Sequence, residues 1–221
     1  MKNCILTERN EKTAVLYVHG KGGSASEAEH YKSLFPNYDV CGLDYKTFTP
    51  WETKNEILSA VKTLSEKYEH IILVANSIGA YYSMNALDAG MIEKAYFISP
   101  IVNMEKLILD MMKWANVAEE ELKQRGTITT EFGEELSWEY LTYVRKNPIH
   151  WKIPTQILYG GHDNLTSMET VSAFARMYGA ELTVMEEGEH WFHTKEQMDY
   201  LDQWIISSTT TKLSCQSSPS S

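Results

Sequence analysis

Short apolar runs rich in β-branched residues alternate along this chain with longer segments whose apolar residues recur at helical spacing. The runs at residues 14–18, 38–43, 71–75, 95–98, 155–159 and 182–185 are expected to be strands. The segments at residues 27–35, 51–68, 78–90, 168–178 and 195–206 are expected to be helices. Such alternation predicts a three-layer α/β fold, with a mainly parallel central sheet of about six to seven strands and helices on both faces. Because ligands bind at the carboxyl ends of parallel strands, the residues directly after each strand are the candidates for chemistry.

The length and apolar content favour one compact domain. The chain has 221 residues, of which 43% are hydrophobic, and we expect residues 1–206 to share one core. Residues 101–150 separate two expected strands where a single crossover helix would suffice, so they form an insertion. Its helical periodicity allows two interpretations: two helices packed on the sheet, or a small helical lid over an active site. We favour the lid, with Met111 and Trp138 lining a substrate pocket.

The charge balance and the cysteines argue against several classes of function. Thirty acidic residues against twenty basic ones give a net charge of -10, which repels nucleic acid and anionic membranes. Cys4, Cys41 and Cys215 lie far apart without metal-ligand spacing, which indicates a reducing compartment and no metal site. The start lacks a signal-peptide pattern and no stretch is long enough to be a membrane helix, so we expect a cytoplasmic protein. Residues 207–221 are dominated by Ser and Thr and are expected to be a disordered tail.

A small-x-Ser-x-Gly turn closes the third apolar run. The segment Ile71-Ile-Leu-Val-Ala-Asn-Ser-Ile-Gly-Ala80 has the pattern of a buried strand that turns at Ser77 and opens a helix. It resembles the nucleophile elbow of the alpha/beta-hydrolase family, where the residues two before and two after the serine must be small because strand and helix nearly touch. Ala75 and Gly79 meet that demand, although the family more often has Gly at the first position. The resemblance makes Ser77 the candidate nucleophile.

A nucleophilic serine needs a histidine that takes up its proton. The family's chain order is Ser, acid, His, and Glu187-Gly-Glu-His-Trp-Phe-His193 follows the last expected strand. This segment resembles the family's Gly-x-His pattern, which assigns the base to His190 and leaves His193 as a substrate-side or structural group. The acid should follow the preceding strand, where Ile157-Leu-Tyr-Gly-Gly-His-Asp-Asn-Leu-Thr166 supplies Asp163. A plain surface turn is the alternative for Asp163.

A glycine-rich loop follows the first expected strand, in Leu16-Tyr-Val-His-Gly-Lys-Gly-Gly-Ser-Ala25. It resembles the family's His-Gly-x-Gly oxyanion loop, which implies that the backbone N–H groups of Lys21 and Ile78 stabilise a developing oxyanion. A phosphate-binding loop is excluded because neither of the known glycine patterns for phosphate is present. We interpret His19 as a structural residue of the loop, and the Lys21 side chain either as solvated or as a group that attracts an anionic substrate.

The resemblance covers about residues 12–206 and implies a function. It predicts a serine hydrolase that cleaves carboxylic esters through a Ser-His-Asp triad and an acyl-enzyme, without a cofactor. The expected partner is a small-molecule ester. Since one fold hosts many activities, a thioesterase, a peptidase or amidase, and a non-catalytic ligand-binding protein remain alternatives.

Overall fold

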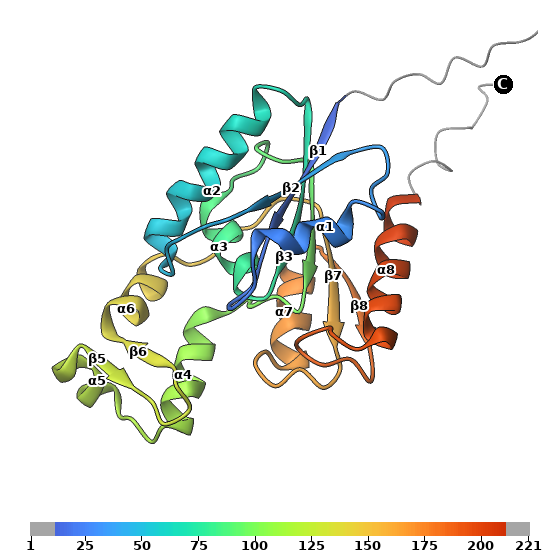
Figure 1. Ribbon diagram of the computed structural model, residues 1–221. Coiled ribbons are helices and arrows are strands. Elements are labelled where there is room, and N and C mark those ends of the chain that lie inside the picture. Colours follow the sequence, from blue (N-terminus) through green and yellow to red (C-terminus); the bar gives the residue numbers. More distant parts are fainter. Residues whose placement is uncertain (1–11, 211–221) are drawn as a thin grey trace, which may run out of the picture.

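The computed structural model describes residues 12–210 and contains a six-stranded, fully parallel central sheet (Figure 1). The strands lie in the order β2-β1-β3-β4-β7-β8. Their bounds are β1 Thr13–Val18, β2 Asp39–Leu43, β3 His70–Asn76, β4 Lys94–Ile98, β7 Thr155–Gly160 and β8 Glu181–Met185. All six predicted strands are present, and the predicted fold class is confirmed.

Helices follow the strands along the chain: η1 Ala25–Glu27, α1 Ala28–Tyr31, α2 Pro50–Ser65, α3 Ile78–Ala86, α7 Met168–Tyr178 and α8 Lys195–Thr210. Four predicted helix ends were wrong. Helix α1 ends at Tyr31 rather than at residue 35, and α2 ends at Ser65 rather than at residue 68. Helix α3 ends at Ala86 rather than at residue 90, because the backbone of Leu87 is extended. Helix α8 continues to Thr210, so residues 207–210 are helical and do not belong to a disordered tail. The described residues do not include the rest of the expected tail or the start of the chain, and so leave out Cys4 and Cys215. Cys41 is a free thiol.

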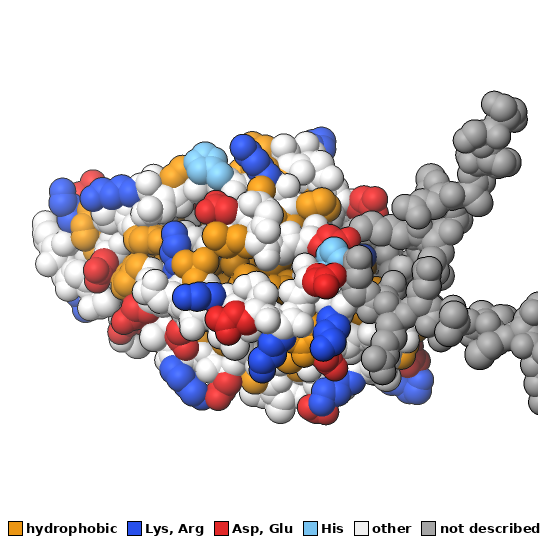
Figure 2. Space-filling view, turned by 90° about the horizontal axis from the view of Figure 1, so that it is seen from above, with side chains coloured by type: hydrophobic (Ala, Val, Ile, Leu, Met, Phe, Trp, Pro, Cys, Tyr) orange, Lys and Arg blue, Asp and Glu red, His pale blue; other side chains and the backbone are white. Residues whose placement is uncertain are grey.

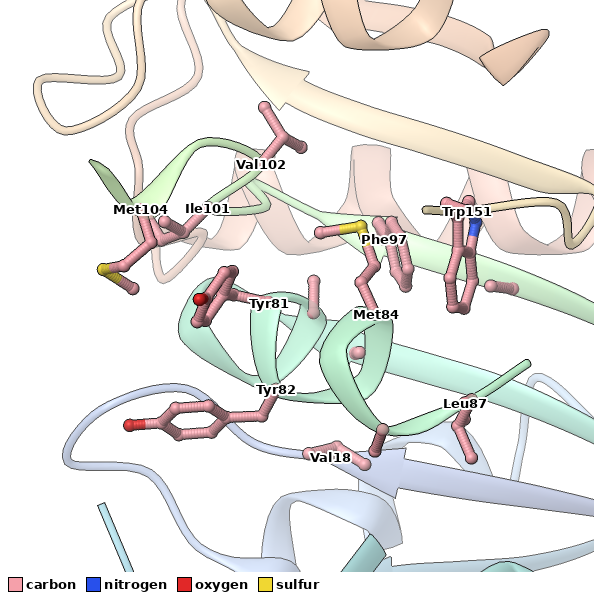
Figure 3. Close-up of a cluster of buried hydrophobic side chains, with 14 of the residues drawn as sticks. Val18, Tyr81, Tyr82, Met84, Leu87, Phe97, Ile101, Val102, Met104 and Trp151 are labelled. Carbon is pink, nitrogen blue, oxygen red and sulfur yellow. The ribbon is translucent and has the colours of Figure 1, made fainter. Parts of the chain in front are cut away.

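Both faces of the sheet are buried, which is why its strands are apolar at consecutive positions. In β3, Ile71, Leu73 and Ala75 point into one core, whereas Ile72 and Val74 point into the other. Helices α2, α3 and α7 cover the first face, and α1 and α8 cover the second. Figure 3 shows the centre of the first core, where α3 packs between the sheet and the segment that follows β4.

The insertion is richer in structure than the sequence predicted. It contains α4 (Met104–Trp114), α5 (Glu119–Arg125), the hairpin strands β5 (Thr127–Thr129) and β6 (Glu135–Ser137), and α6 (Trp138–Lys146). The two expected helices correspond to α4 and α6. Helix α5 and the hairpin were missed.

The insertion is joined to the main domain through α6. The Tyr140 and Tyr143 rings lie 5.8 and 5.1 Å from the Trp51 ring of α2, and Asn85 of α3 donates to the Tyr143 hydroxyl at 3.2 Å. Buried Leu141 adds an apolar contact on the same helix. These contacts place the rest of the insertion beside the carboxyl ends of the strands (Figure 1).

The described surface carries mixed charge. Figure 2 shows acidic and basic side chains interspersed on one face, around a band where hydrophobic side chains gather. The net charge of -10 is therefore not concentrated in one block on this face. Within residues 12–210, no helix combines the length and the apolar character that a membrane span requires.

Candidate active site

Ser77 lies in the sharp turn between β3 and α3. Its φ of 51° and ψ of −119° are strained for a residue with a side chain, and such strain clusters at functional sites. The turn brings α3 against the end of β1: a Cβ atom on Gly79 would lie 2.5 Å from the carbonyl oxygen of Val18. Only glycine fits this close approach, so the small residue predicted at position 79 has a direct steric cause.

Three predicted side chains form one hydrogen-bonded chain. The Ser77 Oγ lies 2.8 Å from His190 Nε2, and His190 Nδ1 lies 2.7 Å from Asp163 Oδ2. An ionised carboxylate only accepts, so Nδ1 carries the proton and Nε2 of the neutral ring accepts from the serine hydroxyl. The Asp163 side chain is fully buried and His190 is only 15% exposed. This arrangement can draw the proton from a serine that attacks a carbonyl group.

The acid is fixed by its own loop. Asp163 Oδ1 accepts hydrogen bonds from the N–H groups of Leu165 at 2.8 Å and Thr166 at 3.0 Å, which leaves Oδ2 for the histidine. The hydroxyl of Tyr159, a residue of β7, donates to the Thr166 carbonyl at 2.7 Å and ties the loop to this strand. The carboxylate is therefore held in one orientation by backbone donors rather than by mobile side chains.

The acid and base loops are also joined to each other. The His162 N–H donates to the Gly188 carbonyl at 2.8 Å, and a Cβ atom on Gly160 would lie 2.6 Å from that same oxygen. Glycine at position 160 thus allows the two loops to touch. His162 itself is exposed, and its ring lies 3.9 Å from Glu187, away from the Ser77 chain.

The glycine-rich loop borders the serine. A Cβ atom on Gly20 would lie 3.2 Å from Ser77 Cβ, so the loop backbone reaches the nucleophile. Among the residues that the structure describes, the Lys21 N–H has no hydrogen-bond partner. The Ile78 N–H is the first of its helix and has no carbonyl one turn earlier within that helix. Both groups have the character expected of oxyanion donors.

The remaining predicted site residues lie elsewhere. His193 stacks on Trp191 at 4.6 Å, and its Nδ1 donates to the Trp191 carbonyl, so it does not join the Ser77 chain. Met111 lies on α4 and packs against the large core. Trp138 opens α6, where Lys123 of α5 lies 5.8 Å from its ring. No described contact brings Met111 or Trp138 to Ser77.

Two cavities of the described structure lie apart from the Ser77, His190 and Asp163 side chains. One, of about 580 Å³, lies between β2 and α2, and the other, of about 520 Å³, lies between α4, α6 and α7. Neither is lined by Ser77, Asp163 or His190. Within residues 12–210, no three His, Cys, Asp or Glu side chains are placed to hold a metal ion.

Two residues at this edge were missed. Trp191 directly follows His190 and is 68% exposed, although nothing in the motif predicts its conformation. Tyr45 follows β2 at the same edge of the sheet and stacks on His19 at 4.1 Å. The position of Tyr45 after a strand was a signal, but the stacking partner is distant in sequence.

Comparisons with known proteins agree on the architecture. No protein-family model matches the chain. Est1E from Butyrivibrio proteoclasticus superposes with a TM-score of 0.71 at 15% identity, over 92% of this chain and 89% of that one. Mouse alpha/beta hydrolase domain-containing protein 10 gives 0.69 at 18% identity, over 91% and 90%. A Mycoplasma genitalium protein named "Putative esterase/lipase 3" is 28% identical over 107 residues, which span 42% of this chain and only 38% of that relative.

Proposed function

The chain has the alpha/beta-hydrolase fold, and from this premise we propose that it is a serine hydrolase that cleaves carboxylic esters. The observation that carries the proposal is the continuous chain from Ser77 Oγ through His190 to buried Asp163, with both links at 2.8 Å or less. Folds of this kind host many activities, so the assignment rests on the site rather than on the fold.

The geometry supports a two-step mechanism. His190 takes the proton of Ser77 as its oxygen attacks the acyl carbon, and Asp163 stabilises the imidazolium that forms. The Lys21 and Ile78 N–H groups then stabilise the negative oxygen of the tetrahedral intermediate. His190 returns its proton to the departing alcohol, and water releases the acyl group from Ser77 in the same way. No step needs a cofactor.

Two comparisons support the hydrolysis of an acyl substrate, and one of them favours an ester. The Mycoplasma relative is named as an esterase/lipase, and a structure of Est1E has been solved with ferulic acid bound. Ferulic acid is an aromatic carboxylic acid, and hydrolysis of an ester, a thioester or an amide releases such an acid, so this ligand supports acyl hydrolysis in general. The name of the Mycoplasma relative is the reason for placing carboxylic esters before thioesters and amides.

The test is a panel of p-nitrophenyl esters from acetate to palmitate, measured on wild type and on Ser77→Ala. We expect turnover by wild type and a loss of about a million-fold in Ser77→Ala, with a similar loss in His190→Ala. Asp163→Asn should cost about ten-thousand-fold, because the wrong tautomer of His190 is then favoured. Ser99→Ala is a matched control, since Ser99 is a buried serine directly after β4, the strand next to β3.

The outcomes separate the alternatives. Thioester and aminopeptide substrates measured in parallel would show whether another acyl group is preferred. A stoichiometric burst of p-nitrophenol without further turnover would favour a ligand-binding protein. Loss of activity in Ser99→Ala equal to that in Ser77→Ala, or an effect of His193→Ala as severe as that of His190→Ala, would contradict the assignment.

A further inference from the structure

The carbonyl group of Gly20 is held from two sides. It accepts a hydrogen bond from the Gly23 N–H at 3.2 Å and another from His19 Nδ1 at 2.8 Å. A carbonyl oxygen only accepts, so Nδ1 of His19 carries a proton. Gly22 makes the intervening turn possible with a φ of 75°, a value that few residues other than glycine adopt.

The two hydrogen bonds to the Gly20 carbonyl orient the N–H group of Lys21. None of the described peptide bonds is cis, and in a trans peptide the C=O and the following N–H point in opposite directions. With the Gly20 carbonyl directed at His19 Nδ1 and the Gly23 N–H, the Lys21 N–H points away from both. It is unpaired within residues 12–210, and the adjoining Gly20 backbone lies against Ser77. The direction of this donor therefore depends on the position of the His19 ring.

The His19 ring is held in turn by Tyr45. The two rings stack nearly parallel, with an angle of 8° and centroids 4.1 Å apart, and both residues are buried. The Tyr45 hydroxyl donates to the His19 carbonyl at 3.0 Å, so one tyrosine fixes both the ring and the backbone of His19. Burial raises the pKa of Tyr45 above its ordinary value, which keeps this hydroxyl protonated and able to donate.

Tyr45 is itself anchored to α3. Its ring meets the edge of the Tyr82 ring at 5.8 Å, and the Tyr82 hydroxyl donates to the carbonyl of Phe48 in the same loop at 2.7 Å. Figure 3 shows Tyr82 extending from α3, the helix that begins directly after Ser77. The loop after β2 and the nucleophile are thus fixed to one rigid helix.

We propose that Tyr45 is a positioning residue for the oxyanion loop: it orients His19, and His19 fixes the Gly20–Lys21 peptide so that the Lys21 N–H faces the reacting carbonyl. The inference rests on the proposed function. It assigns a role to a residue that makes no described contact with Ser77, His190 or Asp163.

The kinetic test compares Tyr45→Phe and Tyr45→Leu with wild type. Tyr45→Phe keeps the stacking and loses the hydroxyl, whereas Tyr45→Leu loses both. Losing an oxyanion donor entirely costs about 100- to 1,000-fold in kcat. We expect kcat to fall by about 3- to 10-fold in Tyr45→Phe and by about 30- to 100-fold in Tyr45→Leu, with KM within about twofold of wild type. Affinity for a trifluoromethyl ketone, whose adduct carries an oxyanion, should weaken in parallel.

Tyr178→Phe is the matched control. The Tyr178 hydroxyl also donates to a backbone carbonyl, that of Ile149, at 2.6 Å, but it lies at the far end of α7. This variant should keep the kcat and inhibitor affinity of wild type. Equal kcat values in Tyr45→Phe, Tyr45→Leu and Tyr178→Phe would overturn the proposal, as would a change in KM alone.

A second readout does not need turnover. In NMR spectra, the imidazole Nδ1 proton of His19 and the amide of Lys21 should shift in Tyr45→Phe and more strongly in Tyr45→Leu, and stay in place in Tyr178→Phe. Unchanged resonances in both Tyr45 variants would overturn the positioning role. A wild-type protein that hydrolyses no ester would instead remove the proposed function, and the NMR comparison would still decide the role of Tyr45.

Discussion

The backbone carbonyls of Val18 and His19 lie where a side chain at position 79 would begin. Gly79→Ala must therefore push α3 away from the end of β1, and overpacking of this kind costs about 1–3 kcal/mol of stability. Because the displaced carbonyl of His19 belongs to the glycine-rich loop that borders Ser77, we expect the proposed ester hydrolysis to slow as well. Urea unfolding and p-nitrophenyl acetate hydrolysis measure the two effects.

Gly90→Ala is the control for this substitution. Gly90 has a φ of 91° and open space around its Cα, so the change should cost about 1–2 kcal/mol through backbone strain alone. We expect its kcat to equal that of wild type. Activity that fell equally in both variants would mean that lost stability, rather than displacement of the loop, explains the Gly79→Ala result.

Sequence patterns predicted some individual residues and not others, for a physical reason. Ser77, Asp163 and His190 each follow a strand, so the fold brings them to one edge of the sheet, where the structure joins them by hydrogen bonds. Tyr45 also follows a strand, but its significance depends on stacking with His19, which no local pattern encodes. Positions after strands can be predicted, whereas side-chain contacts between them cannot.

At the scale of elements, the insertion shows that sequence patterns do not predict very short strands. Strands β5 and β6 have three residues each, too few for an alternating pattern to be distinguished from chance. The longer helices α4 and α6 were predicted because their apolar residues recur over several turns. The short hairpin matters nonetheless, because Glu134 in its turn forms an ion pair with the Lys21 side chain of the glycine-rich loop.

This ion pair places the hairpin beside the site and makes the expected lid testable. Trp114 and Phe132 are about half exposed and meet edge to face at 6.4 Å in the same part of the insertion. We predict that Trp114→Ser combined with Phe132→Ser leaves stability within about 0.5 kcal/mol of wild type, because surface changes rarely cost more. KM for long-chain p-nitrophenyl esters should rise several-fold, and KM for the acetate should not.

The control for the lid is Met177→Ser. Met177 is 73% exposed near the end of α7, away from the carboxyl ends of the strands, and its loss should change neither KM value. If the double variant bound long and short esters like wild type, the insertion would be packed on the sheet without a role in substrate binding, which is the other interpretation of its sequence.

At the scale of the whole molecule, the apolar character of the strands reflects burial on both faces, and this made the architecture predictable. The alternation of strands and helices was sufficient for the parallel sheet, because right-handed crossovers leave few other arrangements. Helix ends were less predictable: α8 continues through Ser207 and Thr209 despite their low helix propensity. Packing of Leu201, Trp204 and Ile205 against the second face outweighs that local preference.

Burial of tyrosines within the two cores predicts how the whole protein responds to alkali. Burial raises the pKa of Tyr31 above its ordinary value and raises that of Tyr82 to about 12. In the unfolded chain these hydroxyls titrate near about pH 10. Below that pH their contribution to stability is fully present, and it is lost as the pH rises through the folded-state values, because the unfolded state releases protons first.

We therefore expect the free energy of unfolding to be constant from about pH 8 to 9.5 and to fall above about pH 10, by about 1.4 kcal/mol per pH unit for each buried tyrosine. Urea titrations at several pH values, followed by circular dichroism and by tyrosinate absorbance, measure this slope. Tyr31→Phe removes one such group and should reduce the slope by about 1.4 kcal/mol per pH unit. A lower tyrosinate absorbance of folded protein near pH 10 in Tyr31→Phe than in wild type would contradict this expectation, since the buried Tyr31 hydroxyl would then titrate in the intact core.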